Sequence, residues 1–178
     1  MNLVRFIAKK IYEHIVTTVR HHPVTFLPTI FIFLILAAMP IGVVGMLNQL
    51  YPTLLINDLA YPLGVLFFSA YYLSICLFFY SYFVTFYLDM WIVTNDRLID
   101  VYQKNLFSRT ISELDLYQIQ DVTSDVHGLF PSIFNYGNVT IQTAGPVPKF
   151  IIHNAHRPHK LRQLVLDLAA EDKRHHNK

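Results

Sequence analysis

The sequence predicts a membrane α-helical hairpin followed by an all-β or α+β domain of antiparallel strands with a C-terminal helix. Three observations support this fold class: two long stretches without charge, a later series of short strand-like segments, and one amphipathic segment near the C-terminus. Of the 178 residues, 53% are hydrophobic and 15% are charged. Soluble domains carry about 25% charged residues, so this composition favours a membrane protein.

The charge deficit is concentrated in two stretches near the N-terminus. Asp, Glu, Lys and Arg are absent from residues 21–57 and from residues 59–88, so Asp58 alone separates the two stretches. Each is longer than the roughly 20 apolar residues that a helix needs to cross a bilayer. We therefore expect transmembrane helices at residues 24–47 and 59–88.

Residues 1–22 are expected to form an amphipathic basic helix in the membrane interface. Apolar residues recur at every fourth position from Leu3 to Val19, and four Lys or Arg face a single Glu13 in this segment. A polar leader with incidental periodicity is the alternative interpretation. The loop between the two spans holds no Lys or Arg, so the positive-inside rule predicts a multi-pass protein of the cell (plasma) membrane with both termini cytoplasmic.

After Leu88 the sequence changes to short runs of β-type residues separated by turns. We expect strands at residues 90–94, 98–102, 110–116, 119–126, 139–143 and 150–153. From Pro158, an apolar stripe with helical spacing from Leu161 to Ala169 predicts an amphipathic helix. A cytoplasmic domain is therefore expected at residues 89–170, with a charged tail at residues 171–178.

Three ordered motifs resemble those of the bacterial pleckstrin-homology (PH) membrane proteins. They are the ten residues from Trp91 to Asp100, the Ile-Gln-Asp-Val core within 116–122, and the segment from Phe134 to Gly145. The resemblance implies a PH-like barrel capped by the C-terminal helix, behind two transmembrane helices. The family-motif positions, whose role the resemblance leaves unknown, are Thr94, Asn95, Arg97, Gln120, Asp121, Gly137, Thr143 and Gly145.

Two parts of these motifs invite a structural interpretation. The Thr94–Arg97 segment has the composition of a tight hairpin turn, and an ion pair between Arg97 and Asp121 is one way to hold the barrel together. The apolar residues between two expected strands form a possible contact loop: Leu129, Phe130, Ile133 and Phe134. This loop either covers the end of the barrel, touches the bilayer or meets a partner.

The residue pattern disfavours several functions. The segment from Asp89 onward has ten basic and ten acidic residues, so we expect no nucleic-acid binding. His153, His156 and His159 are spaced by three, but Pro158 interrupts the series, so solvated histidines are a better interpretation than a metal site. Phosphate-binding and nucleophile motifs are missing from the sequence, and neither span contains an ionisable group of the kind that ion pathways use.

We therefore expect a non-enzymatic protein without a cofactor. Its expected role is that of a protein-interaction or assembly module at the cytoplasmic membrane surface. Its expected partners are membrane lipids and either another protein or further copies of itself. Sensing of lipid headgroups is the alternative, although the first hairpin offers Arg97 beside Asp96 rather than the basic cluster of phosphoinositide-binding PH domains. A subunit of a transporter or of an enzyme complex ranks third.

Overall fold

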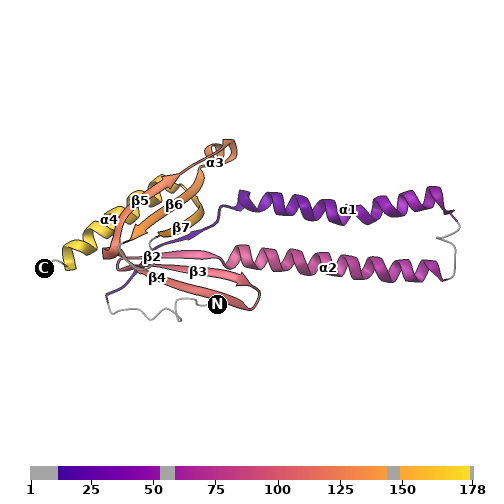
Figure 1. Ribbon diagram of the computed structural model, residues 1–178, viewed down its shortest axis with the longest axis horizontal. Coiled ribbons are helices and arrows are strands. Elements are labelled where there is room, and N and C mark those ends of the chain that lie inside the picture. The colour runs from indigo at the N-terminus through magenta and orange to yellow at the C-terminus, as the bar shows by residue number, and fades with distance from the viewer. Residues whose placement is uncertain (1–11, 53–58, 144–148, 177–178) are drawn as a thin grey trace. The chain divides into compact units, whose positions relative to one another are not determined.

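A computed structural model describes residues 12–52, 59–143 and 149–176. The chain divides into two compact units. A helical unit comprises Phe26–Val84, and a strand-rich unit comprises the segment up to Thr25 together with Thr85–Lys178. The four helices α1–α4 and the strands β2–β7 are labelled in Figure 1.

The helical unit consists of α1 (Leu27–Leu50), which follows a short 3-10 turn, η2 (Pro23–Phe26), and most of α2 (Ala60–Leu88). Both helices are apolar on all faces, which is typical of membrane spans rather than surface helices. The hydroxyls of Tyr71 and Tyr72 on α2 donate hydrogen bonds to backbone carbonyls of α1. The two helices coincide closely with the expected spans and are long and apolar enough to cross a membrane.

The strand-rich unit contains two antiparallel sheets with the strand orders β1-β2-β3-β4 and β5-β6-β7 (Figure 1). The first sheet is formed by β1 (Ile15–Arg20), β2 (Met90–Thr94), β3 (Arg97–Asn105) and β4 (Ser108–Asp115). The second sheet is formed by β5 (Ile119–Asp125), β6 (Tyr136–Thr143) and β7 (Lys149–His156). The remaining elements are a 3-10 turn, η4 (Leu116–Gln118), a short helix, α3 (Leu129–Phe134), and the C-terminal helix α4 (Pro158–His176).

The expected interfacial helix at residues 1–22 is wrong for its second half. Residues 15–20 form β1, which pairs antiparallel with β2, with Val19 opposite Trp91. Five consecutive β-branched residues, Ile15 to Val19, explain this outcome because they favour an extended backbone over a helix. The first half of the expected helix, residues 1–11, lies outside the described residues.

The position of β1 also corrects the expected domain boundary. The strand-rich unit does not begin at Asp89, because its first strand precedes α1 in the chain. In the sequence, both apolar helices are therefore inserted between β1 and β2, which are paired in the sheet. The expected tail at 171–178 is likewise too long, since α4 continues to His176 and buries Asp172 on the same stripe as Ala169.

The strands and the C-terminal helix have the PH-like order that the motifs implied. All six expected strands are confirmed within a few residues, and the segment at 90–94 is confirmed at both ends. The expectation of a closed barrel needs correction: β4 and β5 are not paired in the described part of the chain. Backbone contacts join the two sheets at an isolated bridge between His21 and Ala155, and beside it the N–H of His22 donates to the carbonyl of Asn154 at 2.9 Å.

The main core fills the space between the two sheets and α4. Side chains from β1, β2 and β3 meet those of β5, β6 and β7 and the apolar stripe of α4. Its fully enclosed members include Val93, Leu98, Val139 and Val165. A second, smaller cluster lies on the opposite face of the first sheet and consists of Met90, Ile92, Ile99 and Val101.

Candidate functional site

The strand-rich unit has two ends, which differ in chemistry. At the proximal end, the chain leaves for α1 after His22 and returns from α2 at Asp89. His21 and Asp89 are neighbours there, with 3.0 Å between Nε2 and Oδ2. At the distal end lies the turn between β2 and β3, at Asn95 and Asp96.

Side-chain hydrogen bonds fix the distal turn. The Thr94 hydroxyl accepts a hydrogen bond from the backbone N–H of Arg97 at 2.9 Å and donates to the Arg97 carbonyl at 2.8 Å. The Asn95 side chain accepts from the N–H of His14 at 2.8 Å and donates to the carbonyl of Tyr12 at 3.2 Å. The turn therefore holds the segment that leads into β1, which gives the motif positions Thr94 and Asn95 a structural role.

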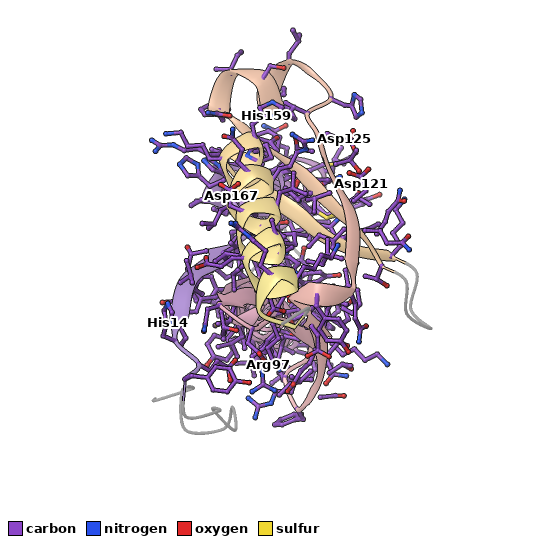
Figure 2. All side chains as sticks on the ribbon, turned by 90° about the vertical axis from the view of Figure 1, so that its left-hand side faces the viewer. His14, Arg97, Asp121, Asp125, His159 and Asp167 are labelled. Atoms are coloured by element: carbon purple, nitrogen blue, oxygen red, sulfur yellow. The ribbon has the colours of Figure 1, made fainter. Side chains whose placement is uncertain are left out.

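Arg97 forms the main ion pair of the distal end, with partners other than the expected one. Its guanidinium donates to both carboxylate oxygens of Glu13 at 2.9 Å and also to Glu113. The hydrogen bond with Glu13 is the largest of the causes that raise the pKa of Arg97 above its usual range. The expected pair with Asp121 is wrong: Asp121 lies on β5, well apart from Arg97 in Figure 2, and accepts a hydrogen bond from the N–H of Val122.

A polar pocket of about 600 Å³ lies beside this turn, where the C-terminal part of α4 approaches it. Three of its lining residues are acidic: Asp96, Glu171 and Asp172. The rest of the lining consists of Tyr12, His14, Asn95 and Leu168. Asp96 and Asp172 are buried and Glu171 is exposed, so the pocket presents negative charge at its surface and in its wall. Sequence reasoning missed this site because its carboxylates come from the distal turn and from residues assigned to the tail.

Two of the remaining motif positions, Gln120 and Gly137, have a structural explanation. Gln120 and Asp121 are exposed, and the register of β5 shifts between Ile119 and Asp121, which makes Gln120 the extra residue of a bulge. A Cβ on Gly137 would lie 2.4 Å from the Asp125 carbonyl oxygen, so only glycine fits there. Thr143 is buried at the end of β6, and Gly145 lies outside the described residues.

The possible contact loop forms α3, and its apolar side chains are exposed rather than folded onto the domain. The exposed fractions are 81% for Leu129, 68% for Phe130 and 72% for Ile133. Phe134 is partly exposed, and its ring lies 6.5 Å from that of His22, between centroids. The interpretation of this loop as a cover over the barrel end is therefore wrong.

The histidines of β7 and α4 do not converge on a metal site. Within the described residues, no group of three or more His, Cys, Asp or Glu side chains is placed to hold a metal ion. His156 stacks on His22 with 5.3 Å between ring centroids, and Ser124 is hydrogen-bonded to Nδ1 of His159 at 2.9 Å. Burial lowers the pKa of His22, and the nearby His156 lowers it further.

Two carboxylates lie beside the exit of α2: Asp89, which is buried, and Asp100, which is half-buried. Asp89 is paired with His21, whose ring packs edge-on against Trp91 at 4.9 Å between centroids. Asp100 stands opposite Trp91 in the register of β2 and β3. Burial raises the pKa of Asp100 to about 6, and the charge of Asp89 adds to this effect. One oxygen of each carboxylate is buried without a hydrogen-bond partner among the described residues.

A basic cleft of about 290 Å³ lies between β1 and the start of α4. Its charged lining consists of Arg20, Arg157 and Lys160, together with His156. The Arg20 guanidinium lies over the ring of Tyr87, in the last turn of α2, at 4.8 Å from the ring centroid. The proximal end is therefore basic where the distal end is acidic, a contrast that the equal numbers of acidic and basic residues after Leu88 conceal.

The comparison with protein families agrees with this architecture. The model of a family described as the bacterial PH domain matches residues 24–169, well over half of the chain. Among solved structures, the chain is similar to a DUF1696-family protein with a pleckstrin-homology domain from Shewanella loihica PV-4. That likeness has a TM-score of 0.38 and 13% sequence identity, and it covers 46% of this chain and 70% of the other. A search among curated proteins finds no match.

Proposed function

This chain belongs to the bacterial PH domain family, and from that premise we propose that it is a membrane-anchored, non-enzymatic module that binds a protein partner at the cytoplasmic face of the cell membrane. The proposal has two parts. The first is the anchor formed by α1 and α2, and the second is a partner site at the distal end.

The pairing of β1 with β2 supports the hairpin topology of the anchor. Residues 15–20 precede α1 and residues 90–94 follow α2, yet they form adjacent strands of one sheet. Both segments must therefore lie on the same side of a membrane that the helices cross. The loop between the helices has no Lys or Arg, whereas four precede α1, and this bias favours the cytoplasmic side for the sheet.

The acidic pocket at the distal end is the observation that carries the second part. Its carboxylates, Asp96, Glu171 and Asp172, are supplied by the distal turn and by α4, at the end of the strand-rich unit remote from its connections to α1 and α2. A pocket of about 600 Å³ is large enough for several side chains of a partner. Charge complementarity favours a basic segment of another protein, or of a second copy of this chain, as the ligand.

Site-specific photo-crosslinking in native membranes tests this proposal. We place a photoreactive phenylalanine at Leu168, which lines the pocket, and at Gln120, which is exposed on β5 outside the pocket. We expect a discrete heavier adduct from position 168 and none from position 120. An adduct of twice the monomer mass indicates a second copy, and any other mass indicates a different partner.

Charge reversal shows whether the acidic pocket causes the adduct. Glu171→Lys is expected to abolish the adduct, while Asp121→Lys, which reverses an exposed charge on β5, is expected to leave it intact. Recovery of only the monomer from position 168 overturns the proposal. An adduct that survives Glu171→Lys also overturns it, because the acidic pocket is then not the binding site.

A further inference from the structure

We propose that the proximal end of the strand-rich unit docks into the headgroup layer of a bilayer containing anionic lipids, through two apolar tips flanked by basic side chains. The proposal rests on the membrane anchoring of α1 and α2 given above. It goes beyond that anchoring because every side chain involved lies outside both helices.

The first apolar tip is the hairpin between β3 and β4. Met90, the first residue of β2, pairs with Val101, but β3 continues to Asn105 before the chain turns. Residues 102–105 are the four that follow Val101 in β3. At roughly 3.3 Å per residue they extend the hairpin about 13 Å beyond the level of Met90, on the side where α2 ends. The residue at the tip is Phe107, with 97% of its surface exposed. A phenylalanine held out at a hairpin tip has no role in the core of the domain.

The second apolar tip is α3, which lies at the same end on the other sheet. Gly137 and Ala155 pair in register, and Ala155 also bridges to His21, so the start of β6 is level with the exit to α1. α3 directly precedes β6 and lies at the ends of β5 and β6 in Figure 1. Its exposed side chains are Leu129, Phe130 and Ile133.

Chain connectivity indicates what these tips meet. The segment after His22 and the segment before Asp89 are the two apolar helices, so a bilayer that holds them begins beside the proximal end. Apolar side chains at that level lower the free energy of the system by moving from water into the interfacial region. The strand-rich unit is attached to the anchor by short connections, so both tips have a high effective concentration at the membrane surface. Even weak individual contacts therefore suffice for docking.

The charges at the proximal end suit an anionic surface. Lys104 and Arg109 flank the first tip and are exposed. Arg20, Arg157 and Lys160 line the basic cleft nearby. Asp125, an exposed carboxylate at the end of β5, offsets one of these five charges. The combination of apolar tips and flanking Lys and Arg is typical of segments that bind the surface of anionic membranes.

Depth-dependent quenching in reconstituted vesicles tests this docking. The full chain carries one cysteine, Cys76, so a Cys76→Ser background allows one environment-sensitive dye to be attached at Phe107→Cys, Phe130→Cys or Tyr117→Cys. Tyr117 is exposed in the turn between β4 and β5 at the distal end and serves as the matched control. The vesicles contain phosphatidylglycerol and phosphatidylcholine, with or without a lipid whose nitroxide lies near the headgroup.

We expect the dyes at positions 107 and 130 to emit at shorter wavelength and to lose most of their emission to the nitroxide lipid. The dye at position 117 should be quenched only by iodide in the water. Quenching of positions 107 and 130 by iodide alone overturns the proposal. Protection from both quenchers also overturns it, because the tips are then covered by protein. In either case the dye attached to the native Cys76 shows whether α2 is in the bilayer, which separates failure of the docking from failure of the anchoring.

A charge variant tests the lipid preference. Lys104→Gln combined with Arg109→Gln is expected to reduce nitroxide quenching at position 107 in phosphatidylglycerol-containing vesicles and to leave it unchanged in pure phosphatidylcholine. Inorganic phosphate added to pure phosphatidylcholine vesicles should not raise the quenching of the parent to its level in the anionic vesicles, because the ligand is the membrane surface rather than a free anion. Equal quenching of variant and parent in the anionic vesicles overturns the role of these two charges.

Discussion

Arg97 and Glu13 form a two-pronged ion pair across 84 residues of sequence, with 2.9 Å between Nη2 and Oε2 and also between Nε and Oε1. The Glu13 side chain is completely buried, and that of Arg97 is 11% exposed. This pair joins the segment that precedes α1 to the turn that follows β2. It therefore connects parts of the strand-rich unit that the whole helical hairpin separates in sequence.

Removing Arg97 should destabilise the strand-rich unit strongly. Arg97→Met leaves the Glu13 carboxylate buried without its main partner, and breaking such a pair typically costs about 3–5 kcal/mol. We expect a large fall in the midpoint of thermal unfolding, which is measured in detergent by the fluorescence of Trp91. Glu113→Gln is the matched control: Glu113 is 47% exposed, and exposed ion pairs contribute about 1 kcal/mol or less. Equal midpoints for the two variants would contradict this account.

Gly137→Ala should destabilise the second sheet. The added Cβ would lie 2.4 Å from the Asp125 carbonyl oxygen and 2.9 Å from Cγ2 of Val126, so the backbone of β5 or β6 must move. We expect a loss of about 2 kcal/mol or more in the free energy of unfolding, the range of strained backbone substitutions. Chemical denaturation of the purified protein measures it. Gly45→Ala in α1 has no atom within 4 Å of the new Cβ and should leave the strand-rich unit unchanged.

Local patterns predicted most of this fold. The β-type runs of β2 and β6, the distal turn and the apolar stripe of α4 all depend on neighbouring residues, and each was found within a few residues of where the sequence placed it. The length and lack of charge of α1 and α2 also depend only on local composition. Such features are readable because backbone preference and burial agree within one short segment.

β1 was missed because the helical spacing of its apolar residues concealed the strand preference of its five β-branched residues, and because its partner strand is distant in the sequence. A spacing of four between apolar residues fits one face of a helix. Residues four apart also lie on the same face of a strand, so the spacing alone does not distinguish the two structures. Pairing of Val19 with Trp91 across the two helices decides between them. The distal pocket was missed for a related reason: Asp172 continues the buried stripe of α4, but a hydrophobic pattern does not count an aspartate.

The position of β1 predicts that the segment from Asp89 to Lys178 cannot fold well alone. Without residues 12–22 it loses Glu13, the core residue Val19 and the strand that covers the edge of β2. We expect poor dispersion of its amide signals in a two-dimensional NMR spectrum and no cooperative unfolding. Joining residues 12–22 to residue 89 by a short glycine-serine linker should restore both properties. The two ends to be joined are close, because Nε2 of His21 lies 3.0 Å from Oδ2 of Asp89. A well-dispersed spectrum from the shorter fragment would contradict the role of β1.

Asp100 should make the strand-rich unit more stable in mild acid. Its pKa is raised from 3.8 to about 6 by burial and by Asp89, so between these values the folded state holds a proton that the unfolded chain has released. The free energy of unfolding therefore falls as pH rises from about 4 to 6 and is level above that, as far as this group is concerned.

Asp100→Asn removes this titration. We expect a variant that is more stable than the parent at pH 7, by roughly 1 kcal/mol once solvent screening of a half-buried group is allowed for, and nearly equal to it at the acid end of the window. Thermal midpoints measured across the window check this, with Asp121→Asn, an exposed carboxylate on β5, as the control. If Asp100→Asn keeps the parent's dependence on pH, another group causes it, and the buried oxygen of Asp100 then has a partner that offsets its desolvation.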